Sequence, residues 1–284
     1  MVTTRLVQLL RASLVLALLS LAFPSMGISA DRPAPTGNEE EESITKGVEA
    51  VLADAKALAL ATLSMDRYDA LKLGGAVGIV GGLIAVDHPI QTFVQRNTTS
   101  SGTDTANRIS DWLGAGPLLG YTAAAIAIGV TNESYGGSSR LKEAGLVSFE
   151  AEGFAIAATS MLKFLTGRAR PDSNQGATHF RPFTGLDTSF ASTTAATSFA
   201  MATVVAERYS GAGWVAYPLA GAVSAARVYT DKHFTSDVVA GALIGYGLGH
   251  FINRQNTGDP KDWQIRSMAM ERGIGGGIMI GKKF

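Results

Sequence analysis

A lysine and an arginine stand seven residues apart at the end of an apolar segment, at Lys163 and Arg170, and Pro171 follows directly. Proline disfavours helical backbone in the residue before it, so regular structure should end here. Two cations directed at one point bind an anion, and a planar guanidinium matches the oxygens of a phosphate. On this segment alone, the alternative is that both cations only interact with the carbonyl dipole at the end of a helix.

A second group of chemically capable residues comprises Arg227, His233 and Asp237. Asp237 follows His233 by four residues at the start of a predicted helix, which Thr235 or Ser236 can cap. The carboxylate can accept a hydrogen bond from one imidazole nitrogen, which fixes the tautomer and leaves the other nitrogen free as a nucleophile. Arg227 adds positive charge to the same pocket. A simple hydrogen bond at a helix start is the other interpretation of the pair.

Together these residues resemble the sequence blocks of the phosphatidic acid phosphatase type 2 and vanadium haloperoxidase superfamily. That superfamily carries K-x6-R-P, then P-S-G-H, then S-R-x5-H-x3-D. The chain matches the first block completely, and it matches the third except that Ala226 stands where serine is usual. The resemblance covers about residues 70 to 252. It implies an all-α fold, a six-helix bundle of the phosphatase and haloperoxidase type.

The middle block is where the sequence departs from the superfamily, because Ala191-Ser192-Thr193-Thr194 replaces P-S-G-H. By resemblance, Ser192 donates its hydroxyl to a phosphate oxygen, and Thr193 replaces a glycine whose amide approaches the anion. Thr194 replaces the histidine that protonates the leaving group, a step that a threonine hydroxyl cannot perform near neutral pH. Such general acid assistance is typically worth about 10² to 10⁴ in rate. His179 is either a surface-loop histidine or a proton donor from another direction.

The resemblance implies a phosphoric monoester hydrolase, with lipid phosphates among the substrates it would accept. Five residues would bind the phosphoryl oxygens, namely Lys163, Arg170, Ser192, Thr193 and Arg227. His233 would attack the phosphorus to form a phosphohistidine, and Asp237 would hold its imidazole. We expect neither a metal nor another cofactor, since no further His, Asp or Glu cluster has the spacing of metal ligands.

Two alternatives use the same fold. The first is a catalytically weak or inactive protein that binds phosphate or phospholipid. The loss of histidine at Thr194 favours this alternative, whereas the intact pair of His233 and Asp237 favours chemistry. The second is a vanadium haloperoxidase, in which vanadate fills the same anion site. Those enzymes also depend on the middle-block histidine, so Thr194 disfavours this class.

Six apolar segments rich in glycine and alanine are expected to position these residues. They lack the alternation of strands and are joined by polar loops, which predicts a helical bundle. The segments lie near 70–86, 113–131, 147–166, 194–208, 214–229 and 236–252. An amphipathic pattern over 44–65 predicts a further helix, and 132–146 and 172–189 are turn-like. The glycines between Gly74 and Gly82 should permit close helix–helix approach.

The first 30 residues have the pattern of a secretory signal peptide, because Arg5 and Arg11 precede a short apolar run that small residues follow. We therefore divide the chain into a signal peptide (1–30), a flexible acidic linker (31–43), a helical phosphatase-like domain (44–255) and a C-terminal tail (256–284). Weak alternation in the tail is compatible with a short strand or with a frayed end. Export would place the domain in the periplasm, soluble or membrane-associated.

Composition excludes several classes of function. The chain of 284 residues has 24 basic and 24 acidic residues and no basic block, so nucleic-acid binding has no electrostatic basis. It contains no cysteine, which rules out disulfides, thiolate catalysis and cysteine-ligated metals. Most apolar runs are nearer to about 15 residues than to the roughly 20 that a bilayer requires. The expected partners are a phosphate ester, phospholipids included, and a membrane surface.

Overall fold

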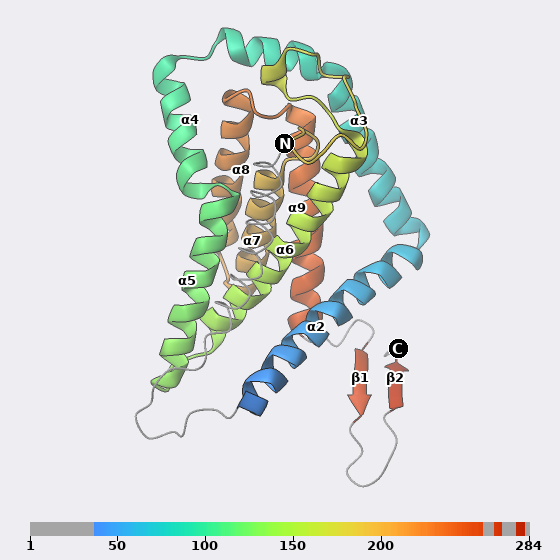
Figure 1. The fold of residues 1–284 in the computed structure, drawn as a ribbon, viewed down its shortest axis with the longest axis vertical. Helices are drawn as coiled ribbons and strands as arrows, with labels where there is room; N and C mark the ends of the chain where they lie inside the picture. The colour runs from blue at the N-terminus through green and yellow to red at the C-terminus, as the bar shows by residue number, and fades with distance from the viewer. Residues whose placement is uncertain (1–36, 258–263, 269–276, 282–284) are drawn as a thin grey trace.

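The computed structural model describes residues 37–257, 264–268 and 277–281. Apart from one two-stranded hairpin, regular structure in these ranges is helical, which confirms the predicted all-α fold class (Figure 1). In chain order the elements are α2 (Gly37–Leu63), α3 (Arg67–Arg96), α4 (Ser100–Leu113), α5 (Ala115–Ser134), α6 (Arg140–Thr166), the short helix η1 (Pro171–Ser173), α7 (Thr193–Arg208), α8 (Gly213–Tyr229), α9 (Thr235–Thr257), β1 (Gln264–Met268) and β2 (Gly277–Gly281).

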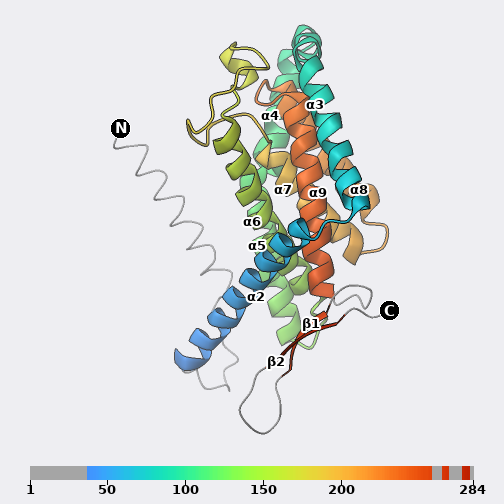
Figure 2. The same cartoon turned by 90° about the vertical axis from the view of Figure 1, so that its right-hand side faces the viewer.

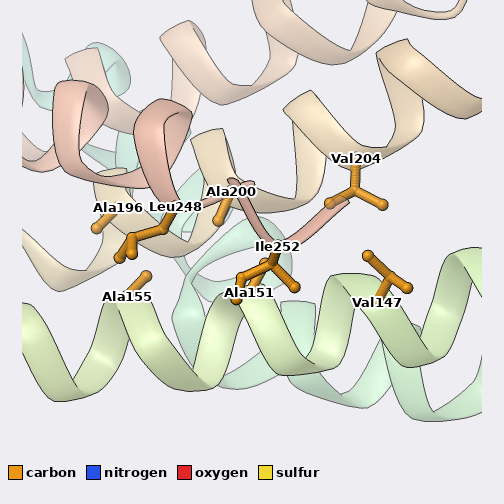
Figure 3. Close-up of a cluster of buried hydrophobic side chains, with 8 residues drawn as sticks. All are labelled: Val147, Ala151, Ala155, Ala196, Ala200, Val204, Leu248 and Ile252. Atoms are coloured by element: carbon orange, nitrogen blue, oxygen red, sulfur yellow. The ribbon is translucent and has the colours of Figure 1, made fainter. Parts of the chain in front are cut away.

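Helix α7 lies at the centre of the bundle, against α6, α8 and α9 (Figures 1 and 2). Small side chains face one another across α6, α7 and α9 and form the buried apolar core (Figure 3). The core residues are Val147, Ala151, Ala155, Ala196, Ala200, Val204, Leu248 and Ile252. Because half of them are alanines, the helix backbones approach closely, and dense van der Waals contact holds the three helices together.

Glycines on α9 permit its close contact with α7. A Cβ atom added to Gly241, Gly245 or Gly249 would lie 2.4, 2.0 or 2.6 Å from a backbone oxygen at α7. No side chain fits at these positions, so glycine at every fourth residue sets the distance between the two helices. Among the described residues, the close approach predicted for the glycines from Gly74 to Gly82 on α3 is not seen, because a Cβ on any of them would meet nothing within 4 Å.

Helix α4 is an element that the sequence pattern misses. Its residues are mostly polar, and Ala106 is its one fully buried position. The helix begins after Thr99, whose side chain accepts a hydrogen bond from the amide of Gly102 at 3.2 Å. Its few apolar residues, Ala106, Ile109 and Leu113, do recur at helical spacing, but a search for long apolar segments passes over them; contact with α8 stabilises the helix.

Two predicted boundaries are corrected by the structure. The linker expected over 31–43 is helical from Gly37 onward, because glutamate favours helix and is stabilised near a helix N-terminus. The loop expected over 132–146 shortens to the few residues between Ser134 and Arg140.

The C-terminal tail contains an antiparallel hairpin in which Gln264 pairs with Gly281 and Met268 with Gly277. Of the two alternatives for this tail, a short strand or a frayed end, the structure has strands. The predicted signal peptide (1–30) lies outside the described residues.

The outer surface of the bundle is unusually apolar along α3. Leu71, Val77 and Ile79 are each more than half exposed. Two helical segments, Arg67–Arg96 and Ser100–Ser134, are long and apolar enough to cross a membrane. The sequence underestimated these lengths, because polar residues interrupt the apolar runs without ending the helices.

Candidate phosphate-binding site

Three separate parts of the chain meet at one end of the bundle. They are the C-terminal end of α6 with the loop after it, the N-terminal end of α7, and the turn between α8 and α9 (Figures 1 and 2). These are the positions of the three sequence blocks, so the fold brings together residues that lie up to 74 positions apart, from Lys163 to Asp237. Every residue predicted for the site is found in or beside this region.

The end of α6 is set by Gly167, which adopts a left-handed conformation with φ of 57°. A Cβ atom here would lie 1.6 Å from the carbonyl oxygen of Arg181, so only glycine fits. Beyond this turn Arg168 enters the interior, whereas Arg170 stays half-buried and its Nη2 donates to the carboxylate of Asp187 at 2.8 Å. The first block thus supplies one buried arginine and one arginine at the rim.

Three cations share the site. Burial lowers the pKa of Lys163 to about 8, and the positive charges of Arg170 and Arg227 act in the same direction. Burial and the charge of Arg170 also lower the pKa of Arg227. The Nε atoms of Arg170 and Arg227 are buried without hydrogen-bond partners in the described part of the chain. Cations that repel one another and retain unused donors form a site suited to an anion.

His233 is buried, and the structure assigns its tautomer. Its Nδ1 lies 2.9 Å from the carbonyl oxygen of Ser189. Because a carbonyl can only accept, Nδ1 carries the hydrogen and Nε2 keeps its lone pair free. Burial lowers the pKa of His233 to about 4, against the opposing effect of Asp237 and with the charge of Lys163 acting in the same direction as burial. The imidazole is therefore neutral near pH 7, as a nucleophile must be.

The predicted hydrogen bond from His233 to Asp237 is corrected by the structure, because Nδ1 lies 3.8 Å from the carboxylate. Asp237 instead accepts from the amide of Phe234 at 2.8 Å and from the hydroxyl of Ser189. Burial alone would raise the pKa of Asp237, but nearby His233 and the charge of Arg168 hold it below its ordinary value. Asp237 thus holds Ser189, and Ser189 orients the histidine.

The middle block forms the start of α7. Ser192 is fully buried and caps the helix, since its hydroxyl accepts from the amide of Ala195 at 3.4 Å. The hydroxyl of Thr193 lies 3.0 Å from that of Thr159 on α6, which draws its side chain to that helix. Thr194 is half-buried at the second position of the helix. The first amides of a helix have no partner within it, so this end also favours an anion.

Arg168, Asp87 and Ser189 belong to the site but were missed from the sequence. All three are buried, with at most 1% of each residue exposed. Arg168 is ion-paired with Asp237 at 2.6 Å and with Asp87 at 2.7 Å. Arg168 lies between Lys163 and Pro171 within the first sequence block, but a residue predicted in a loop carries no sequence signal of burial. Nothing local in the sequence pointed to Ser189.

Helix α3 carries a row of polar residues that forms hydrogen bonds with the end of α8 and the turn after it. Asp87, Gln91 and Gln95 are spaced by four residues and so share one face of the helix. Gln91 donates to Asp231, and Gln95 donates to the carbonyl oxygen of Tyr229 at 3.4 Å. Polar residues at this spacing in an apolar helix are a signal that sequence inspection had available.

His179 lies in the loop that packs beside the first block. Its carbonyl oxygen accepts from the amide of Ala169 at 2.9 Å, and its half-buried ring has an unpartnered, buried Nε2. This position is compatible with both interpretations of His179. Across the described residues, no three His, Cys, Asp or Glu side chains are grouped as a metal site would require. The expectation of metal-free chemistry remains a prediction.

A histidine among three cations at one end of an all-α bundle is the arrangement that the sequence blocks predict for the phosphatases and haloperoxidases. Residues 145–259 match the sequence model of the PAP2 superfamily. This matching segment runs from within α6 through α9 and holds all three sequence blocks.

One solved structure shares the fold, the crystal structure of the first transmembrane PAP2 type phosphatidylglycerolphosphate phosphatase from Bacillus subtilis. The TM-score is 0.50 at 18% sequence identity, and the match covers 75% of this chain and 97% of that chain. A search of curated proteins gives no match. The likeness supports the PAP2-type bundle as the architecture of the chain.

Proposed function

We propose that the chain is a PAP2-type phosphatase, a phosphoric monoester hydrolase that works through a phosphohistidine. The observation that carries the proposal is the neutral His233, whose Nδ1 is held by the Ser189 carbonyl and whose free Nε2 belongs to a ring beside the cations Lys163 and Arg170, with Arg227 close to Lys163. Cations stabilise the charge that develops on a transferring phosphoryl group, while the imidazole supplies the electron pair.

The reaction has two displacements. Nε2 of His233 attacks the phosphorus, the N–P bond forms, and the ester oxygen leaves with the electron pair of the broken P–O bond. Water then attacks the phosphorus, the N–P bond breaks, and inorganic phosphate and neutral imidazole are released. Ser192 and the amides of Thr193 and Thr194 would hold phosphoryl oxygens with the three cations. The alcohol must take its proton from solvent or His179, because Thr194 replaces the usual acid.

Hydrolysis of p-nitrophenyl phosphate by the purified protein tests the proposal, because p-nitrophenolate leaves without protonation. We expect turnover that His233→Ala abolishes. Thr194→His should speed the hydrolysis of alkyl phosphates by about 10² or more, since it restores the acid, and should change p-nitrophenyl phosphate hydrolysis far less. Absence of wild-type turnover, together with phosphate binding that Arg227→Ala weakens, would instead support the phosphate-binding alternative.

A lipid phosphate is the substrate class that the surroundings of the site favour. An apolar groove of about 500 Å³ lies between α3, α7, α8 and α9. Its lining includes Val228 and Tyr229, which follow Arg227 directly, and Thr235 at the start of α9. An acyl chain in the groove would place its phosphate headgroup at the cations. Two long apolar helical segments support membrane association of the same chain. Export to the periplasm is proposed from the N-terminal pattern alone.

Filling the groove should separate lipid from soluble substrates. Ala225 is exposed on α8 and lines the groove, so Ala225→Trp should lower kcat/KM for dispersed phosphatidic acid about tenfold. The same variant should leave the hydrolysis of p-nitrophenyl phosphate unchanged. Ala222→Trp is the matched control, because Ala222 is exposed on the same helix outside the groove lining. Equal loss for both substrates would contradict the assignment of the groove.

A further inference from the structure

Arg168 has no free donor for a substrate. Its Nη1 donates to the carboxylate of Asp237 at 2.6 Å and to the hydroxyl of Ser236 at 2.7 Å. Its Nη2 donates to Asp87 at 2.7 Å and to the carbonyl of Ala177 at 2.6 Å, and Nε donates to the same carbonyl at 2.8 Å. These contacts use all five N–H groups of the guanidinium. Arg168 therefore acts on the protein itself rather than on an anion.

Arg168, Asp87, Ser236 and Asp237 form a closed unit that we call the Arg168 clamp. All four residues are buried, and the backbone amide of Ser236 also donates to Asp87 at 3.0 Å. Burying such charges carries a large desolvation penalty, and apolar replacements for buried ion pairs are often neutral or stabilising. Stability alone is thus a weak explanation for the clamp, whereas a requirement for fixed geometry explains why every polar group in it is paired.

The clamp is joined to the nucleophile through one residue. The second oxygen of Asp237 accepts from the hydroxyl of Ser189, whose carbonyl oxygen lies 2.9 Å from Nδ1 of His233. The amide of Ser189 in turn donates to the carbonyl of Arg168 at 2.8 Å. Ser189 is thereby held at its hydroxyl and its amide. The carbonyl group of Ser189 therefore has a fixed orientation toward Nδ1 of His233. It selects the tautomer in which Nδ1 carries the hydrogen.

We propose that Arg168 and Asp87 are positioning residues, which fix Asp237 and Ser189 so that Nε2 of His233 faces the phosphoryl group. The proposal rests on the proposed function for its kinetic part only. Asp87 belongs to α3, outside the segment 145–259 that matches the superfamily. Helix α3 is thus part of the catalytic unit rather than an accessory to it.

Kinetics of the full-length chain provide the first test. Arg168→Gln should lower kcat for p-nitrophenyl phosphate by about tenfold to hundredfold, as loss of outer-shell partners does for histidine ligands of metals. KM should change less than about twofold, because the phosphate-binding cations are intact. Arg168→Lys keeps the charge and should recover part of kcat. Arg181→Gln is the matched control, since Arg181 is an exposed arginine of the same loop, and its kinetics should equal those of the wild type.

A readout that needs no turnover keeps the two proposals separable. The chain has four histidines, so ¹⁵N-histidine labelling gives a simple spectrum in which His233→Ala assigns the His233 signals. The wild type should show hydrogen on Nδ1 of His233. The charged groups that face His233 and Asp237 are Lys163 and Arg168, with Arg170 at longer range. Removing the cation in Arg168→Gln should raise the pH at which His233 titrates, and removing the anion in Asp87→Asn should lower it.

The activity and the His233 signals together distinguish the positioning role of Arg168 from the proposed phosphatase function. An inactive wild type whose His233 signals respond as expected would retain the clamp and reject the phosphatase. Unchanged His233 signals in folded Arg168→Gln would overturn the clamp, whatever the activity. The proposal would also be overturned if Arg168→Gln only lowered the yield of folded protein, while kcat and the His233 titration matched those of the wild type. Such a result would show that Arg168 has a purely structural role. If Arg168→Gln does not fold, Asp87→Asn keeps the acceptor oxygen for Ser236 and decides by the same titration.

Discussion

Burial shifts the pKa values of His233 and Lys163 downward, and the two shifts have complementary effects on chemistry. A pKa of about 4 keeps His233 uncharged over most of the accessible pH range. A pKa of about 8 leaves Lys163 charged at neutral pH but brings its loss of charge within reach of experiment. Both groups are cations when protonated, so removal from water disfavours the same form in each. In the proposed mechanism, this combination supplies an uncharged nucleophile beside charged ligands for phosphate.

The pH profile of kcat/KM should reflect Lys163 on its alkaline side. Because the lowered pKa belongs to the free enzyme, activity should fall as pH rises through about 8. Lys163→Arg should move this limb upward, since arginine keeps its charge to far higher pH. Steady-state rates from pH 5 to 10 on p-nitrophenyl phosphate measure the effect. A limb at the same pH in both proteins would exclude Lys163 as its source.

Helix packing also buries an acid outside the site, at the interface of α5 and α6. Glu152 is fully buried, and one of its oxygens accepts from the hydroxyl of Thr122 at 3.0 Å. Its other oxygen has no hydrogen-bond partner within the described residues. Burial raises the pKa of Glu152 to about 8, against the hydrogen bond from Thr122, which lowers it. The folded chain therefore keeps this carboxyl protonated at neutral pH.

Stability should depend on pH through Glu152 in a defined direction. Between the ordinary pKa of 4.5 and the folded value of about 8, the folded state holds a proton that the unfolded state has lost. The free energy of unfolding should therefore fall as pH rises through this window, by at most about 1.4 kcal/mol per pH unit. Glu152→Gln should remove this dependence and raise stability at pH 8. Denaturant unfolding at pH 5 and pH 8 measures it.

Glu49 offers the control for that measurement, because it is an exposed glutamate on α2. Glu49→Gln should leave the difference in unfolding free energy between the two pH values as it is in the wild type. A wild-type chain that is as stable at pH 8 as at pH 5 would show that Glu152 is not protonated in the folded state.

At the scale of the whole molecule, α3 presents two different faces. One carries Asp87 and Gln91, which are buried against the catalytic turns. The rest of the helix is exposed and apolar, and it includes Val77 and Ile79. A surface of this kind is expected to contact lipid rather than water. The same helix would then attach the enzyme to a membrane and complete its site.

Charged substitutions on the outer face of α3 should weaken membrane association without loss of chemistry. Val77→Asp with Ile79→Asp should reduce cosedimentation with phospholipid vesicles severalfold, because each carboxylate must leave water to enter lipid. Hydrolysis of p-nitrophenyl phosphate in detergent should be unchanged. Ser138→Asp with Ser210→Asp is the matched control, because both serines are exposed and lie outside the two apolar segments. Equal vesicle binding by both double variants would show that α3 is not the lipid-facing surface.

The sequence by itself determined the helical class and most of the residues that meet in the site. Lys163, Arg170, Arg227 and His233 could be found because their spacing is local and their chemistry is rare in apolar segments. Inspection of the middle block also showed that Thr194 stands where the resemblance implies a general-acid histidine. Local patterns also gave most helix boundaries, but they missed α4, whose few apolar residues recur at helical spacing among polar ones, and they ended α3 too early.

Only the tertiary structure decided which groups are buried and which partners they take. Arg168 and Arg170 are the same residue type two positions apart, yet one is enclosed by Asp87 and Asp237 while the other lies at the rim. Asp87 lies 81 residues before Arg168, so no local sequence pattern predicts their contact. Desolvation and hydrogen-bond geometry depend on every helix that packs around a group. That is why the partner of His233 proved to be a backbone carbonyl rather than the carboxylate four residues away.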